Sequence, residues 1–370
     1  MSFARNVELN GANYVQFAGT RTFGSLDGLR AIAILAVVWH HTAVVIPGWR
    51  ITSRGFLGVD LFFIISGFLI VTLLLRERRR TGTLSLRNFY IRRFLRIFPA
   101  YYLTLLVVGT VAFLKPGGTE SPLVRRDLPF AAFFVSNLTP MLSLLSVTWS
   151  LSAEEQFYLL APAVEKYAGR MMRFLLPLAY LLVSLPPLGL FPSLHLPHFF
   201  REATFGPILL GVMLAHVLDD PRGFSWVSRV VGGRLGPPIA LFLIVVLASW
   251  PVDDISGWPR IGVHWAMVAL VASCVVREDN LLAPTLRLWP MRRIGIVSYG
   301  IYLYHLSVMR FVLGGLNKAG VRWPFVTFLG TALATWIVAE RSYRLLEARF
   351  LALKARFTQP GLRPREDTPR

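Results

Sequence analysis

The sequence predicts an all-α polytopic membrane protein with about ten transmembrane helices plus one re-entrant or partial helix, both termini being cytoplasmic. Apolar residues make up 54% of the chain and charged residues only 16%, whereas about 25% of a typical soluble domain is charged. The mean hydropathy is +0.54. The apolar residues come in blocks of about 18–20, the length of a helix that crosses a bilayer, and most basic residues lie between the blocks.

The apolar blocks follow one another along the chain and define the expected spans. The first block is expected to be a retained span, because the polar residues 1–25 do not resemble a cleavable signal. The blocks cover residues 29–46, 56–75, 97–114, 128–147, 149–166, 171–190, 203–218, 237–251, 258–276, 294–314 and 324–343.

The block at 128–147 decides the topology, because its crossing would reverse the orientation of every later span. If it does not cross, the cytoplasmic segments carry about three times as many Lys and Arg residues as the outer segments, which agrees with the excess of positive charge in cytoplasmic loops. If it crosses, the outer segments carry the excess. The charges therefore predict that 128–147 is re-entrant or partial, which leaves about ten spans.

One membrane domain is expected, since the chain has no sequence repeat and no second soluble domain. Residues 1–23 are expected to be a cytoplasmic N-terminal segment, 24–346 the transmembrane domain and 347–370 a partly disordered cytoplasmic tail. Membrane topology explains the net charge of +19 better than nucleic-acid binding does, and membrane lipids with anionic headgroups are the expected partners. The one cysteine, Cys274, lies in an apolar block, so we expect a buried residue and no disulfide.

Two ionisable residues share one face of the first span, which reads LDGLRAIAILAVVWHHT. Arg30 and His41 lie about 20° apart around a helix and about 16 Å apart along it, whereas His40 lies about 80° from that face. Ionisable residues within a span are candidates for function: Arg30 suits an anionic ligand, and His41 suits general base catalysis on a hydroxyl. The alternative is that the histidines end the helix at the interface while Arg30 reaches back to water.

Two other segments offer charged pairs. FYIRRFLRIFPAYY places Arg93 and Arg96 on one helix face beside a span. Paired guanidinium groups suit phosphates, and a topology anchor is the alternative. TWSLSAEEQFYLLAP opens a later span with Glu154 and Glu155. The helix dipole explains one acid, whereas two indicate a carboxylate that orients a histidine or balances Arg30.

Four polar residues in two further spans are candidates for the substrate site. Asp60 and Ser66 lie in GFLGVDLFFIISGFLI, where Ser66 favours close helix approach and lacks the GxSxG context of a nucleophile. Tyr302 and His305 lie in SYGIYLYHLSVM, and packing is slightly favoured over catalysis for His305. The segment SLHLPHFF offers two histidines, which are too few ligands for a metal, so no metal site is expected.

These segments, in this order, resemble the membrane-bound acyltransferase-3 family, which includes bacterial O-acetyltransferases of lipopolysaccharide, exopolysaccharide, Nod factors and macrolides. The resemblance covers about residues 24–345. The family's arginine–ten–histidine motif, paired arginine motif, acidic block and late tyrosine–histidine block fall, in that order, on Arg30 and His41, Arg93 and Arg96, Glu154 and Glu155, and Tyr302 and His305.

The resemblance implies ten core helices in a bacterial cytoplasmic (inner) membrane and an acyltransferase for groups other than aminoacyl groups. Its donor substrate would be acyl-CoA, by default acetyl-CoA, taken from the cytoplasm, and no cofactor would be permanently bound. The acceptor would be a carbohydrate, glycoconjugate or macrolide that undergoes O-acetylation. Some members carry a fused extracytoplasmic esterase-like domain, and this chain is expected to be a stand-alone form without it.

The same resemblance implies His41 as the main catalytic group, either as general base or as transient acyl carrier. Arg93 and Arg96 would hold the phosphates of acyl-CoA, while Arg30 would lie along its arm. The predicted orientation places His41 toward the outer side, which favours an acceptor that arrives from outside over one that arrives from within. The alternative function is a transporter or flippase of lipid-linked sugars, in which the intramembrane charges line a path.

Overall fold

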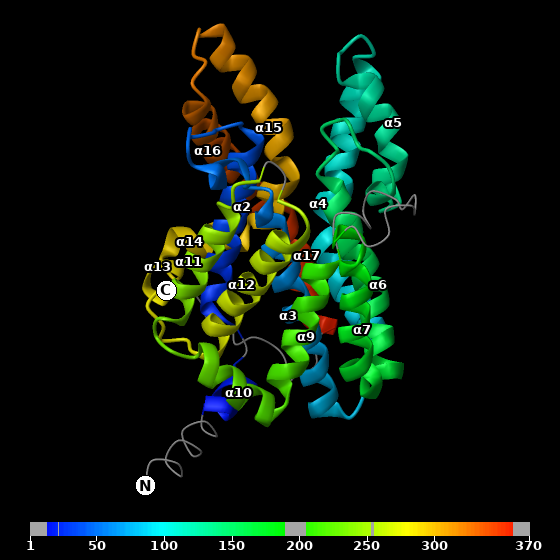
Figure 1. Ribbon diagram of the computed structural model, residues 1–370. Helices are drawn as coiled ribbons and strands as arrows, with labels where there is room; N and C mark the ends of the chain where they lie inside the picture. The colour runs from blue at the N-terminus through cyan, green and yellow to red at the C-terminus, as the bar shows by residue number, and fades with distance from the viewer. Residues whose placement is uncertain (1–12, 21, 189–204, 253–254, 358–370) are drawn as a thin grey trace.

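The computed structural model describes residues 13–20, 22–188, 205–252 and 255–357, and within these ranges the chain is helical without a β-strand (Figure 1). The prediction of an all-α protein is therefore confirmed. The main helices are α2 (Gly24–His41), α3 (Leu57–Thr81), α4 (Leu86–Leu114), α5 (Ser121–Ala132), α6 (Thr148–Ala168), α7 (Met172–Ser184), α9 (Gly206–Asp219), α10 (Pro221–Val231), α11 (Gly236–Ala248), α12 (Gly257–Val276), α13 (Ala283–Leu286), α14 (Trp289–Ile296), α15 (Ser298–Lys318), α16 (Pro324–Ser342) and α17 (Ala348–Lys354).

Several of these helices are long and apolar enough to cross a membrane. Among the described residues, α3, α4 and α12 meet this condition individually. The number rises to 6 if each bent pair of helices forms one span, the pairs being Asn13–Gly19 with α2, α10 with α11, and α14 with α15. The helices α7 and α9 are apolar but shorter. The chain is thus a multi-pass membrane protein by the length and composition of its helices.

The block at 128–147 does not form a helix of spanning length. Helix α5 ends at Ala132, and a 3-10 turn, Ser136–Leu138, and further turns lead from there to α6. The fully buried Asp127 fixes this connection, because its Oδ2 accepts hydrogen bonds from the backbone N–H groups of Leu142 and Ser143, both at 2.9 Å. A backbone held in this way satisfies its polar groups within the protein.

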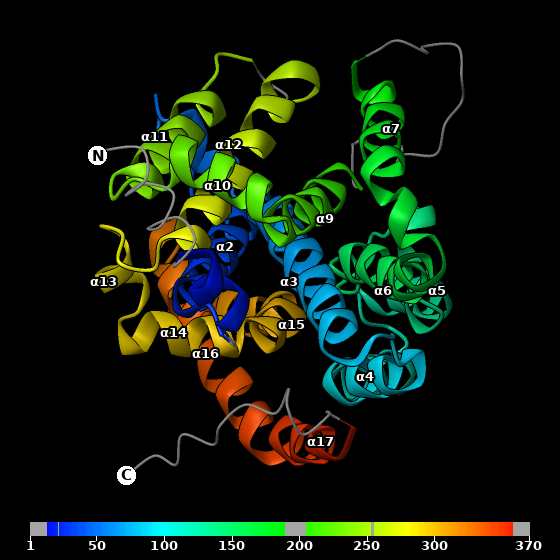
Figure 2. The ribbon, with the colours of Figure 1, turned by 90° about the horizontal axis from the view of Figure 1, so that it is seen from below.

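Helix α3 is the central helix, and glycines bring its backbone into contact with two neighbours (Figure 2). A Cβ atom on Gly58 would lie 2.3 Å from the carbonyl oxygen of Ala33 in α2. One on Gly67 would lie 2.3 Å from the carbonyl oxygen of Ile208 in α9. These approaches require residues without a side chain, and they hold α2, with Arg30, firmly against α3.

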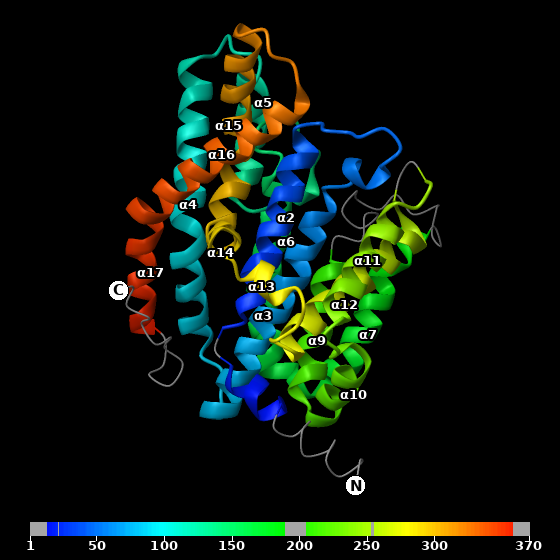
Figure 3. The same cartoon turned by 90° about the vertical axis from the view of Figure 1, so that its left-hand side faces the viewer.

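Helices α4 to α7 lie on the other side of α3 from α2, α14 and α15 when the molecule is viewed as in Figure 2. After α16 the chain forms a π-helical turn, Tyr343–Glu347, followed by α17 and a short 3-10 turn, Ala355–Phe357. This C-terminal segment packs beside α4 (Figure 3). Cys274 is buried in α12, as expected.

Candidate active site

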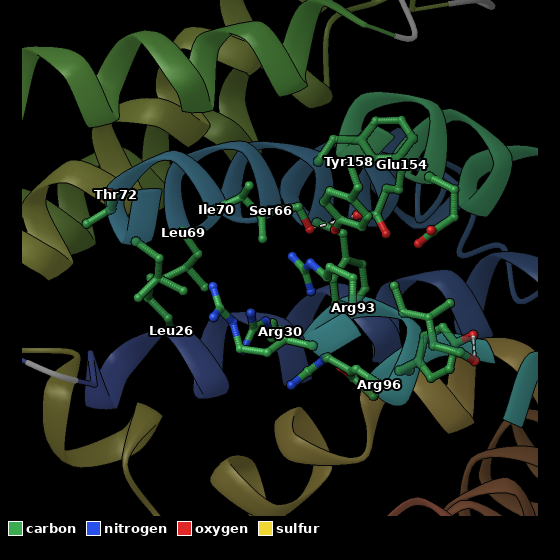
Figure 4. Close-up of a pocket in the computed structure, with 18 of the residues that line it drawn as sticks. Leu26, Arg30, Ser66, Leu69, Ile70, Thr72, Arg93, Arg96, Glu154 and Tyr158 are labelled. Atoms are coloured by element: carbon green, nitrogen blue, oxygen red, sulfur yellow. Dashed lines mark hydrogen bonds between the residues drawn. The ribbon is translucent and has the colours of Figure 1, made fainter. Parts of the chain in front are cut away.

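A cavity of about 340 Å³ lies between the central helix α3 and the helices α2, α4, α6 and α15. Apolar side chains, among them Leu26, Phe63 and Ile70, form part of its wall (Figure 4). The polar side chains of the wall come from elements that are far apart in sequence and include Asp27, Arg30, Ser66, Arg76, Glu77, Arg92, Arg93, Arg96, Ser150, Glu154, Glu155, Tyr158, Tyr299, Tyr302 and Lys354.

Three of the predicted cationic residues meet in this cavity. Arg93 and Arg96 project from the same face of α4, since they are separated by one helical turn, and Arg30 projects from α2 (Figure 4). The guanidinium of Arg93 stacks over the ring of Tyr158, 4.1 Å from its centroid, and that of Arg30 pairs with Asp27 at 3.0 Å. The cavity therefore offers fixed, partly desolvated cations to an anionic ligand.

The two predicted acids line the same cavity from α6. Glu154 accepts a hydrogen bond of 2.7 Å from the hydroxyl of Ser66 in α3 (Figure 4). This contact joins α3 to α6 and places the Glu154 carboxylate among the arginines, where it balances part of their charge. The residue that contacts His41 is a different one, His305.

His41 and His305 form a pair of imidazoles between α2 and α15. Nδ1 of the fully buried His305 lies 2.7 Å from the carbonyl oxygen of Tyr302, which can only accept, so this nitrogen carries the proton. In the neutral ring Nε2 of His305 is then an acceptor, and it lies 3.2 Å from Nδ1 of His41. The carbonyl oxygen of Val37, at 2.9 Å, is a second acceptor for the same nitrogen. His41 is thus held with its proton on Nδ1 and a lone pair on Nε2.

Tyr302 lies between the cavity and this histidine pair. Its hydroxyl lines the cavity and forms a hydrogen bond of 2.6 Å with the hydroxyl of Ser150 in α6. Its backbone carbonyl accepts the hydrogen bond from Nδ1 of His305. Neither His305 nor His41 is among the residues that line the cavity. Tyr302 therefore links the cavity wall to the histidine pair, and it lies less than one helical turn from His305 along α15.

Asp60 belongs to a separate buried cluster. Its carboxylate lies 2.9 Å from Nε2 of His264, which is 1% exposed, and pairs with the guanidinium of Arg260 at 3.2 Å. Both partners come from α12, so the cluster ties the start of α3 to α12. Asp60 is not among the residues that line the cavity, and the structure separates it from the other predicted site residues.

Several residues and contacts of the site region could not be predicted from the sequence. Within the described ranges no group of three or more His, Cys, Asp or Glu side chains could hold a metal ion, and the SLHLPHFF segment lies outside those ranges. The contact of Asp60 with His264 spans 204 residues, and no local motif points to it. Tyr158 and Lys354 were also missed, since an aromatic residue or a lysine at a helix surface carries no signal of its own.

Comparison with known proteins gives the family. The acyltransferase-domain family, acyltransferase-3, matches residues 23–339. A protein of Staphylococcus aureus (strain COL) whose name places it among the O-acetyltransferases is 30% identical over 371 residues, which cover 91% of this chain and 58% of that protein. The O-acetyltransferase OatA of Staphylococcus aureus (strain NCTC 8325 / PS 47) is 31% identical over 356 residues, covering 88% of this chain and 57% of OatA.

The chain thus spans little more than half the length of these relatives. No solved structure matches it. The match of one family over almost the whole membrane domain, from Phe23 in front of α2 to Ala339 near the end of α16, includes every residue of the cavity discussed above except Thr22 and Lys354. The chain belongs to the acyltransferase-3 family.

Proposed function

We propose that the chain is an integral membrane O-acyltransferase that moves an acyl group, by default acetyl, from acyl-CoA to a hydroxyl of a carbohydrate, glycoconjugate or macrolide acceptor. The observation that supports the proposal best is the cavity, which has arginines in its wall and, through Tyr302, contacts a histidine pair. The names of the relatives support the class of reaction. Those names do not say which acceptors the relatives modify, so the proposed acceptor class rests on the family resemblance.

The proposed topology has ten spans, with both termini in the cytoplasm of a bacterial cell and the protein in its inner membrane. The distribution of Lys and Arg supports this orientation. It places the connection between α3 and α4, with Arg92, Arg93 and Arg96 following it, on the cytoplasmic side. The donor, acyl-CoA, is available there, whereas the end of α2 that carries His41 faces outward.

The proposed donor site uses the cavity arginines for the phosphates of acyl-CoA. Arg93 and Arg96 bind the phosphates, since guanidinium groups match the geometry of phosphate oxygens. The arm of the donor runs along the apolar wall past Arg30 toward Tyr302. To bring the thioester to His41, the arm displaces the hydrogen bond between Ser150 and Tyr302.

The proposed chemistry is a direct acyl transfer with His41 as general base. Nε2 of His41 takes the proton of the acceptor hydroxyl while the hydroxyl oxygen attacks the thioester carbonyl. The tetrahedral intermediate collapses with cleavage of the C–S bond, and the leaving thiolate takes the proton back from Nε2. His305 accepts the hydrogen bond of the Nδ1–H group of His41, which stabilises the imidazolium that forms. An acyl-His41 intermediate is the two-step alternative.

The test uses purified full-length protein with labelled acetyl-CoA and measures release of CoA and labelling of added acceptor glycans. His41→Ala should abolish release, because the general base is lost. His40→Ala is the matched control, since its ring contacts the carbonyl oxygen of Ser53 at 3.1 Å instead of His305. Full transfer by His41→Ala would refute the assignment, and labelled protein in the absence of acceptor would favour the two-step route. A transporter would release no CoA.

A further inference from the structure

The C-terminal segment beyond α16 forms a wall of the cavity. The π-helical turn, α17 and the final 3-10 turn pack against α4. Nη1 of Arg92 in α4 donates a hydrogen bond of 2.8 Å to the carbonyl oxygen of Phe357, which fixes the end of this segment. The family match ends at residue 339, so this wall is a feature of the chain outside the part that its family defines.

One side chain of the segment reaches the cavity. Lys354, the last residue of α17, lines it together with Arg92, Arg93 and Arg96 of α4. Arg92 already pairs with the buried Glu77 at 3.0 Å and donates a hydrogen bond to the carbonyl oxygen of Phe357, so it is largely committed to structure. Lys354 thus adds a cation to the wall of the cavity that also contains the two arginines assigned to phosphates by the proposed function.

We propose that Lys354 is a further donor-binding residue, whose ammonium group binds a phosphate of acyl-CoA and so makes the phosphorylated thioester, rather than a thioester of unphosphorylated pantetheine, the preferred donor. This inference rests on the proposed function. The geometry of the wall supports it: Lys354, on a separate C-terminal element that packs against α4, lines the same cavity as Arg93 and Arg96 of α4. An ammonium group binds phosphate as a point charge, so it needs no fixed fork geometry.

The positive charges around Lys354 agree with a site that binds an anion. Desolvation, followed by the charges of Arg96, Arg93 and Arg92, lowers the pKa of Lys354 to about 7. The other charged groups of α17 and of the elements packed on it are Arg87 in α4, Arg344 and Glu347 in the π-helical turn, Arg349 in α17 itself and Arg356 in the 3-10 turn. A dianionic phosphate would favour the charged ammonium, so binding of the donor below pH 7 finds Lys354 protonated, whereas binding well above pH 7 must first add a proton.

The experiment measures binding of CoA and of pantetheine to the detergent-solubilised full chain by calorimetry between pH 6 and pH 9. At pH 6, Lys354→Met should weaken CoA binding about tenfold, the effect of one charge-assisted hydrogen bond, and leave pantetheine binding unchanged. At pH 9 the variant and the wild type should bind CoA equally. Titration of the ligand's own phosphates cancels in the ratio of the two proteins.

Two further variants keep the result interpretable. Lys354→Arg should bind CoA tightly over the whole pH range, because a guanidinium stays charged. Arg356→Met removes an exposed cation two residues away and should bind CoA like the wild type. Equal CoA binding by wild type and Lys354→Met at pH 6 would overturn the inference and leave the proposed function intact. Absence of CoA binding by the wild type would overturn the proposed function itself.

Discussion

Replacement of His305 by phenylalanine tests whether the second imidazole positions and stabilises the first. The variant keeps a buried ring in α15 but removes the acceptor that lies 3.2 Å from Nδ1 of His41. The carbonyl oxygen of Val37, at 2.9 Å, remains as an acceptor. The variant therefore loses one of the two hydrogen bonds that hold the proton on Nδ1.

The expected loss follows from the charge of His41 in the transition state. A hydrogen bond to a charged group contributes about 1.5–3 kcal/mol, and the 3.2 Å contact is long, so the lower value applies. A loss of about 1.5 kcal/mol corresponds to about a tenfold fall in kcat. Since the bond strengthens only when His41 becomes charged, the KM for acetyl-CoA should not change.

Steady-state CoA release by purified His305→Phe, with thermal melting to confirm the fold, measures this effect. His305→Gln should recover most of kcat, because the amide oxygen can take the place of Nε2 as acceptor. Tyr304→Phe is the matched control on the same helix, since it loses a hydrogen bond of 2.7 Å to Ser342 and does not touch His41. An unchanged kcat in His305→Phe would refute the positioning role, and so would a loss as complete as that of His41→Ala.

Three other changes test the donor site and the packing. Arg93→Ala should raise the KM for acetyl-CoA about tenfold in the release assay, because it removes a charged partner of the phosphates. A rise in KM no larger than the rise caused by removing an exposed cation would contradict this. Gly295→Ala should lower the melting temperature sharply or prevent folding, because its Cβ would lie 1.9 Å from the carbonyl oxygen of Asp27; a protein as stable as wild type would refute the close contact. Arg54→Met should destabilise the fold by about 2–4 kcal/mol, since the guanidinium donates hydrogen bonds to the carbonyl oxygens of Ala248, the last residue of α11, and of Val252 beyond it. Unchanged melting would contradict that role.

Local patterns were sufficient for much of the helical architecture. Helix α2 (Gly24–His41) covers most of the first apolar block, 29–46, because a largely apolar run has few other structures in a membrane. For the block at 128–147, the distribution of Lys and Arg was needed to predict that it does not cross. Its hydropathy resembles that of a span, but the contacts of the buried Asp127 with Leu142 and Ser143 fold it into a loop, and hydropathy alone cannot anticipate a tertiary hydrogen bond.

The candidate site was predicted in its parts but not in its pairing. Helix phase put Arg30 and His41 on one face, and both lie in α2, yet only Arg30 lines the cavity. A glutamate was expected either to orient a histidine or to balance Arg30, and the described contact of His41 is with a different residue, His305 in α15. The choice between these residues depends on how α2, α6 and α15 pack, and one-dimensional spacing contains no information on that packing.

The hydrogen bond between Ser150 and Tyr302 also bears on the permeability of the membrane. If the cavity admits acyl-CoA from one side, as proposed, water would fill it whenever the donor is absent, and water inside a bilayer offers a route for ions. On the proposed function, the two hydroxyls, 2.6 Å apart, would interrupt that route before His41. The same contact would then let the protein keep a donor cavity within the bilayer and still retain the proton gradient across the membrane.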